Sequence, residues 1–206
     1  MVLYLFVGIF SATLSALPLG ASNIAVINTT LKENANQAFK IAITAGIAEV
    51  LLSYFALDCN MAIRDFFEQN IWVQISIIVI LFSVGLYLFF KEQSKNTPKK
   101  LKISQSKYAT GFILGVLNPP VLLFWVIAFS VMQNNDIMLS LESSLLVLFL
   151  FFFGVYLGKL ITLYGYSKVS ILIKNRIDNI STMINKVTGV LLVFIALAQS
   201  LNLYLV

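Results

Sequence analysis

Six apolar stretches, separated by short polar loops, account for most of this chain. About 20 consecutive apolar residues are needed for a helix to cross the hydrocarbon core of a bilayer. Since lipid offers no hydrogen-bond partner to the backbone, such stretches fold as helices. The sequence therefore predicts an all-α, polytopic membrane protein with a single transmembrane domain over 1–206. The predicted spans lie near 2–25, 39–58, 71–90, 108–132, 143–166 and 183–204.

The composition agrees with a multi-pass membrane protein. Of the 206 residues, 59% are hydrophobic and 11% are charged, whereas soluble domains carry about 25% charged residues. The first apolar stretch is too long for a signal-peptide core and has no Lys or Arg before it, so we expect it to be retained. The net charge of +5 does not indicate nucleic-acid binding, because the basic residues lie in loops between spans.

The positions of these basic residues predict how the spans are oriented. Twelve of the 14 Lys and Arg residues lie in the loops after the first, third and fifth spans, and Arg64 alone lies in the loops of the opposite side. Cytoplasmic loops carry the excess of positive charge. We therefore expect those three loops in the cytoplasm and both termini outside it. The stretch 91–107, with six lysines, is expected to be a solvated cytoplasmic loop.

Two interrupted segments suggest an internal repeat. "LSALPLGASN" (14–23) lies in the first span, and "LGVLNPPVLL" (114–123) lies at the same place in the fourth. Six spans with both ends on one side divide into two three-helix halves of opposite orientation, here about 1–90 and 108–206. Matching Pro- or Gly-interrupted spans in inverted halves are the sequence pattern that marks a transporter's substrate site.

The first interruption contains Pro18 and Gly20, followed directly by Ser22 and Asn23. A proline removes one backbone hydrogen bond, and the freed carbonyl needs a protein partner or a wet cavity in hydrocarbon. A break here would expose N–H groups at the start of a half-helix, which favour a carboxylate. A substrate site and a purely structural kink are both open interpretations.

The second interruption is "NPP", Asn118, Pro119 and Pro120. The two prolines cannot donate backbone hydrogen bonds, and a residue before proline is disfavoured in the helical conformation. The amide of Asn118 could cap a helix or contact a substrate, so a hinge and a binding role remain open. The patterns Gly111/Gly115 and Gly154/Gly158 are predicted to be helix-packing faces, which would also allow a homodimer.

Glu49 and Lys159 are the charged residues deepest in the predicted spans. Glu49 lies roughly 15 Å and Lys159 about 10 Å from the cytoplasmic edge, at 1.5 Å per helical residue. An acid at that depth indicates a functional site, either a proton-coupling carboxyl or a counter-charge for an amine. The alternatives are a protonated Glu49 bonded to a helix neighbour, and a Lys159 that reaches the surface. An ion pair between them would lower the cost of burying both.

The residue inventory excludes several kinds of chemistry. The chain has one cysteine, Cys59, and no histidine, so an internal disulfide and a dithiol redox pair are impossible. A transition-metal site is a poor fit for so few intramembrane ligands, and no pattern for hydrolysis is present. We expect neither an enzyme nor a cofactor.

These residues together resemble the lysine exporter/homoserine–threonine exporter family (LysE/RhtB) of small bacterial membrane proteins over nearly the whole chain. The family's Pro-Gly-Pro-type first motif is similar to Pro18-Leu19-Gly20, and its acidic residue after a glycine in the second span is similar to "GIAE" (46–49). Its fourth-span motif is similar to "GFILGVLNPP" (111–120), with Pro120 in place of the family's lysine.

The resemblance implies export of amino acids or close derivatives through the cytoplasmic (inner) membrane of a bacterium, driven by proton antiport. The implied partners are an amino-acid-like substrate, protons and the lipid bilayer. Export of another small solute or ion, and a non-transporting membrane scaffold, remain the alternatives.

Overall fold

The computed structural model describes residues 1–18, 20–90, 106–134 and 137–172, and a few positions between 186 and 201. Its first compact unit comprises Met1–Ala62 and Lys100–Asn175, and its second comprises Ile63–Lys99 and Arg176–Val206. In the described part all regular structure is helical: α1 (Val2–Ala16), α2 (Ala21–Lys32), α3 (Ala35–Gln69), α4 (Ile71–Phe90), α5 (Lys107–Val116), α6 (Pro119–Asn134) and α7 (Leu145–Leu172).

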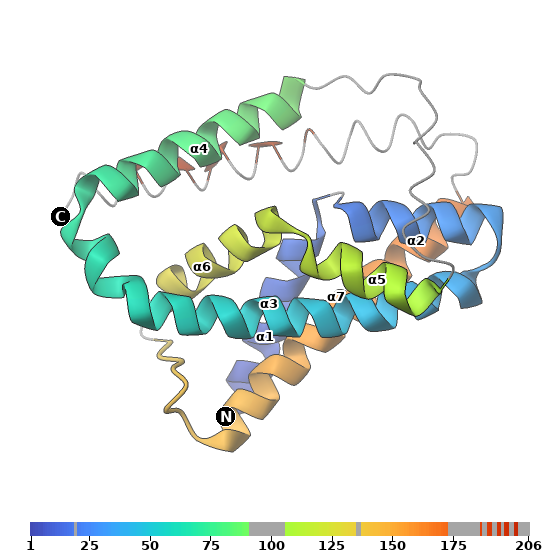
Figure 1. Cartoon of the computed structure of the whole chain (residues 1–206), viewed down its shortest axis with the longest axis horizontal. Coiled ribbons are helices and arrows are strands. Elements are labelled where there is room, and N and C mark those ends of the chain that lie inside the picture. Colours follow the sequence, from blue (N-terminus) through green and yellow to red (C-terminus); the bar gives the residue numbers. More distant parts are fainter. Residues whose placement is uncertain are drawn as a thin grey trace. The chain divides into compact units, whose positions relative to one another are not determined.

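The first and fourth predicted spans are each broken into two helices where the sequence places its prolines. α1 and α2 meet at an angle of 77°, and α5 meets α6 at 54° (Figure 1). α2 continues to Lys32, beyond the predicted end of the span at 25, because Thr29 and Thr30 are buried within the unit rather than solvated in a loop.

α3 and α7 are the two helices that are long and apolar enough to cross a membrane without a break in the described part of the chain. Counting each bent pair as one span raises the number to four. α3 runs on to Gln69, past the predicted span end at 58, and no Gly or Pro within it after Gly46 ends the helix earlier. The sixth predicted span, 183–204, lies mostly outside the described residues, so six spans and the side of each terminus stay predictions.

Glycines let α1 and α7 cross in close contact. A Cβ placed on Gly154 or Gly158 of α7 would collide with the carbonyl oxygen of Leu5 or Ile9 of α1, and one on Gly8 would collide with that of Phe151. Leu5 lies at Gly154 and Ile9, one turn further on, lies at Gly158, so the two helices run in the same direction. Small residues at such a crossing let two backbones approach closely in a membrane.

A second glycine crossing joins α5 to α3. A Cβ on Gly111 would collide with the carbonyl oxygen of Ile41, and one on Gly115 would lie 2.5 Å from the Cβ of Ala48. These helices also run in the same direction as each other. Both predicted glycine faces therefore pack within the chain, as helix-packing faces.

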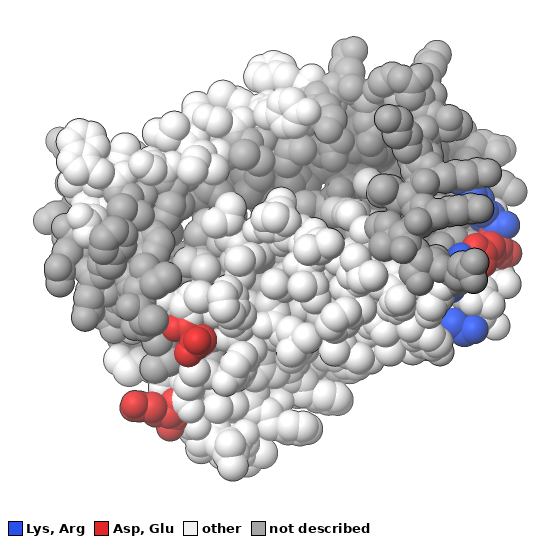
Figure 2. Space-filling view, viewed as in Figure 1, with Lys and Arg blue, Asp and Glu red and all other residues white. Residues whose placement is uncertain are grey.

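The surface of the first unit is apolar where a bilayer would cover it. Phe6, Phe10 and Phe149 are each more than half exposed. Charged side chains on the face drawn in Figure 2 gather toward its two ends, and the described surface between them is uncharged. An uncharged band between charged ends is the arrangement that a membrane-spanning helical protein requires.

The second unit has its own glycine contact. Gly85 of α4 lies against the backbone of Gly189, and a Cβ on Gly85 would come within 2.9 Å of the Gly189 carbonyl oxygen. The helix α4 spans Ile71–Phe90, as predicted from the third apolar stretch.

Candidate functional site

The two deeply placed charges form an ion pair inside the first unit. Lys159 Nζ of α7 lies 3.1 Å from Glu49 Oε2 of α3, and the two side chains are 2% and 1% exposed. Lys159 therefore does not reach the surface. The pair is closed off from solvent on all sides, because both residues are among the most completely buried in the unit.

The second oxygen of Glu49 is held by two uncharged donors. Trp125 of α6 donates its indole N–H to Oε1 at 3.0 Å, and the hydroxyl of Ser15 of α1 also donates to Oε1. Lys159, Trp125 and Ser15 thus contact both oxygens of the carboxyl group, and the hydroxyl of Ser15 also lies within hydrogen-bond distance of the carbonyl oxygen of Ala12, at 3.0 Å. The four helices α1, α3, α6 and α7 meet at this one carboxyl group.

The first break is satisfied by side chains rather than open to a cavity. The amide of Asn23 donates to the carbonyl oxygens of Ala16 and Pro18, both at 2.7 Å. Tyr166 of α7 donates its hydroxyl to the carbonyl oxygen of Leu17 at 2.6 Å. Three carbonyls at the end of α1 thus receive partners from side chains. This is the compensation that a broken helix needs in hydrocarbon.

Pro18, Gly20 and Ser22 surround this arrangement. The N–H of Gly20 donates to the carbonyl oxygen of Pro18 at 2.7 Å, and Gly20 then begins α2 in an extended conformation. The hydroxyl of Ser22 lies 3.3 Å from the Asn23 side-chain oxygen, and both residues are buried. The structure therefore gives Asn23 a structural task that the sequence left open.

The second break lies against the first. A Cβ placed on Gly20 would lie 3.2 Å from the side-chain nitrogen of Asn118, so glycine leaves room for this amide. The carbonyl of Asn118 accepts the first hydrogen bonds of α6, from Val121 and Leu122. Pro119 and Pro120 occupy the start of α6, where a missing N–H costs least, and both are exposed.

The predicted site residues thus form two neighbouring groups. Pro18, Gly20, Asn23 and Asn118 gather at the paired breaks, while Glu49 and Lys159 form the buried pair. Ser15 connects the groups, because it lies one turn before Pro18 and binds Glu49. Pro119 and Pro120 take no part in the ion-pair group.

Three side chains that the sequence did not single out complete the site, namely Ser15, Trp125 and Tyr166. A buried indole N–H or phenol O–H needs an acceptor, so a tryptophan deep in a span was the available signal for Trp125. Tyr166, one residue before Ser167 on α7, had no comparable signal.

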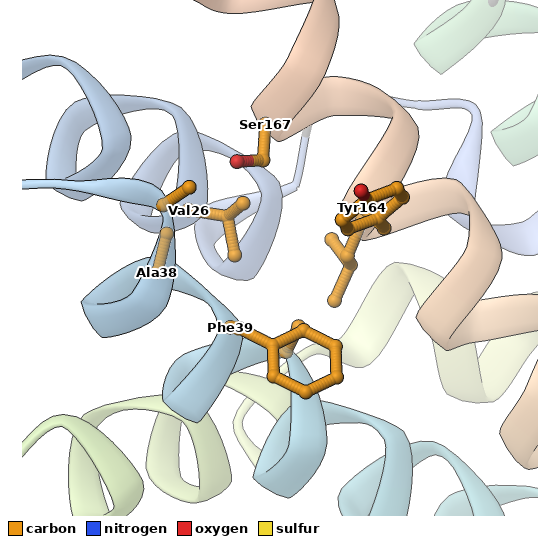
Figure 3. Close-up of a pocket in the computed structure, with 8 residues that line it drawn as sticks. Val26, Ala38, Phe39, Tyr164 and Ser167 are labelled. Carbon is orange, nitrogen blue, oxygen red and sulfur yellow. The ribbon is translucent and has the colours of Figure 1, made fainter.

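One small hollow lies between α2, α3 and α7, away from the ion pair. Figure 3 shows Val26, Ala38, Phe39, Tyr164 and Ser167 around it. Its lining is mainly apolar, and the hydroxyl of Ser167 already pairs with that of Thr30 at 2.8 Å. The hollow therefore suits neither a metal nor a charged substrate. Among the described residues, no cluster of His, Cys, Asp or Glu could hold a metal ion.

We expect Asn23→Leu to destabilise the protein, because the buried carbonyls of Ala16 and Pro18 would lose their donor. An unsatisfied buried polar group costs about 1–3 kcal/mol. Asn28→Leu, a half-buried asparagine on the same helix, is the control for side-chain volume. Thermal denaturation of the purified protein in detergent measures both. Equal melting temperatures for the two variants would contradict the structural role of Asn23.

Comparison with known proteins identifies the family to which this chain belongs. The family model for the LysE type translocator matches residues 13–201. No curated protein and no solved structure shows a significant match. With that match covering both helix breaks and the buried ion pair, the chain is a multi-pass membrane protein that belongs to the LysE-type translocator family of transporters.

Proposed function

We propose that this protein exports amino acids or close derivatives from the cytoplasm by proton antiport. The observation that carries the proposal is the buried Glu49–Lys159 pair in a translocator. Splitting such a pair leaves two uncompensated charges, each of which costs several kcal/mol when buried. A zwitterion avoids this cost, because its ammonium can replace Lys159 at Glu49 while its carboxylate pairs with Lys159.

The same carboxyl group offers a basis for antiport. A proton and a substrate ammonium both neutralise the charge of Glu49, so only one of them can occupy it at a time. Exclusive occupancy by proton or substrate is the physical requirement for exchanging one against the other across a membrane. Proton binding from outside would displace the exported ammonium, and proton loss to the cytoplasm would make Glu49 available again.

The helix arrangement supports two inverted repeats and alternating access. α1 runs parallel to α7, and α5 runs parallel to α3. α3 is antiparallel to α7, because Ala38 and Ala42 lie beside Ser167 and Leu163 while Glu49 lies beside Lys159. An inverted 3+3 repeat would exchange these two parallel pairs. We propose that the halves rock about the two breaks, with both termini outside a bacterial cytoplasmic membrane.

Counterflow of labelled solutes in proteoliposomes tests this function. We expect zwitterionic amino acids to be exchanged, more rapidly with an opposing pH gradient, and Glu49→Gln to abolish exchange. Glu33→Gln is the control, because Glu33 forms a half-exposed ion pair with Lys107 at the end of α2. It should leave exchange within about twofold, since such surface pairs contribute little.

Testing a range of labelled solutes in the same assay also distinguishes the alternative functions. Exchange of simple amines but not of zwitterions would favour an exporter of another small solute. Failure of a broad amino-acid panel, both with and without the gradient, would favour a membrane scaffold and overturn the proposal.

A further inference from the structure

We propose that Trp125 couples the ion pair to an aromatic seal on one side of it, and so acts as a positioning residue for Glu49. This inference rests on the proposed function. Trp125 is fully buried in the core, and its indole N–H binds the carboxyl group on which exchange would depend.

The aromatic seal consists of Trp125, Phe129 and Phe151. The ring centre of Trp125 lies 5.6 Å from that of Phe129 and 6.1 Å from that of Phe151, and Phe129 and Phe151 are 5.7 Å apart. All three side chains are at most 4% exposed. Mutual contact of three buried rings makes a dry, close-packed barrier.

The seal lies between the ion pair and the chain segment that joins α6 to α7. Phe151 precedes Lys159 by eight residues, about 12 Å along α7. Phe129 follows Trp125 by one turn toward the end of α6. In the proposed orientation this is the extracytoplasmic side. The seal would therefore close the exit path of an exported substrate.

The other side of the ion pair is packed with smaller side chains. A buried cluster of Val26, Ala38, Ile41, Ala42, Ala45 and Leu163 lies there, and it borders the small hollow of Figure 3. The pair therefore has three large aromatic rings on one side, whereas the buried cluster on the other side is aliphatic, half of it alanine. In the described structure, the bulkier side chains lie between the ion pair and the proposed exit.

The hydrogen bond between Trp125 and Glu49 connects the ion pair to the aromatic seal. Trp125 and Ser15 hold Oε1 of Glu49, whereas Lys159 holds Oε2. With Oε1 occupied by two donors, Oε2 is the atom at which an incoming ammonium can replace Lys159. If Glu49 turns toward that ammonium, the indole N–H of Trp125 must follow or lose its acceptor. Since its ring is the centre of the seal, exchange at Glu49 would disturb the barrier.

Trp125→Phe tests the positioning role, because it removes the N–H and keeps an aromatic ring in the seal. We expect KM for amino-acid exchange to rise about tenfold, the scale of a lost hydrogen bond to a charged group, with the maximal rate within about twofold. Phe124→Leu is the control. Phe124 packs edge-on against Trp125 at 5.7 Å and has no group that can bind Glu49, so KM should stay unchanged.

A spectroscopic measurement does not depend on the Trp125 variant folding well. The chain has two tryptophans, and Trp72 is 76% exposed, so Trp72→Phe leaves Trp125 as the single indole emitter. We expect its emission maximum to shift when a transported amino acid is added, and the shift to vanish in Trp72→Phe/Glu49→Gln.

The outcomes separate the two proposals. Exchange by the wild type together with an unchanged KM in Trp125→Phe and no emission shift would overturn the role of Trp125 alone. A wild type that exchanges no amino acid would overturn the proposed function and this inference with it.

Discussion

Lys159→Met is expected to destabilise the protein by about 3–5 kcal/mol, and adding Glu49→Gln is expected to restore most of that loss. Removing one partner of a buried ion pair leaves an uncompensated charge, whereas removing both charges is often nearly neutral. In the single variant Glu49 would keep only its two neutral donors, Ser15 and Trp125. In the double variant the amide oxygen of the introduced glutamine can accept from the same two donors.

Resistance to denaturation in detergent, measured for all four members of this double-mutant cycle, gives the coupling energy directly. Lys107→Met is the matched control, because Lys107 pairs with Glu33 at a site where the side chains are 27% and 42% exposed. Surface pairs contribute about 0–1 kcal/mol. If Lys159→Met and Lys107→Met lost equal stability, the buried pair would contribute no more to the free energy of unfolding than the partly exposed pair does.

The double variant also separates stability from transport. We expect Glu49→Gln/Lys159→Met to fold and yet exchange no amino acid, because neither an ammonium nor a carboxylate would find its counter-charge. A stable double variant with wild-type exchange would contradict the proposed site.

Gly158→Ala is expected to lower stability by about 1–3 kcal/mol, the usual cost of overpacking a close-packed interior. The added Cβ would run into the carbonyl oxygen of Ile9 and come within 3.0 Å of the Ala12 Cβ. Backbone atoms cannot move aside as a flexible side chain can, so α1 and α7 would have to separate. Lys159 follows Gly158 directly, and the displacement would therefore also reach the ion pair and reduce exchange.

Gly165→Ala, on the same helix, makes the same chemical change where a Cβ would meet no atom within 4 Å. Alanine favours a helix over glycine by about 0.5–1 kcal/mol, so this variant should be slightly more stable than the wild type. Thermal denaturation and proteoliposome exchange compare the two. A shared direction of change would show that helix propensity, rather than the α1–α7 contact, governs both positions.

Some features of the site could be predicted because they follow from the cost of polar groups in hydrocarbon. Two lone charges deep in the spans had to be neutralised or paired, and Glu49 and Lys159 are paired. The prolines had to interrupt their helices, and the bends occur at Pro18–Gly20 and before Pro119. The same reasoning could not choose the partners of the freed carbonyls, because several nearby side chains can donate hydrogen bonds.

The helix ends were likewise predictable from the sequence only in part. The predicted span 71–90 agrees with α4, whereas α2 and α3 extend beyond their predicted ends. Hydropathy marks where a segment becomes polar, and a helix continues through polar residues when other helices provide partners. Thr30 does this in α2 by pairing with Ser167 of α7.

The sequence by itself determined the membrane class, the helical structure, the two breaks, the glycine contact faces and the presence of two buried charges. Each of these follows from one segment's composition in a solvent that cannot hydrogen-bond. Only the tertiary structure decided that Asn23 and Tyr166 satisfy the first break, and that Ser15 and Trp125 share one oxygen of Glu49. Hydrogen bonds form within about 2.7–3.2 Å, so these partners depend on how the helices rotate and cross, and the glycine contacts set that crossing.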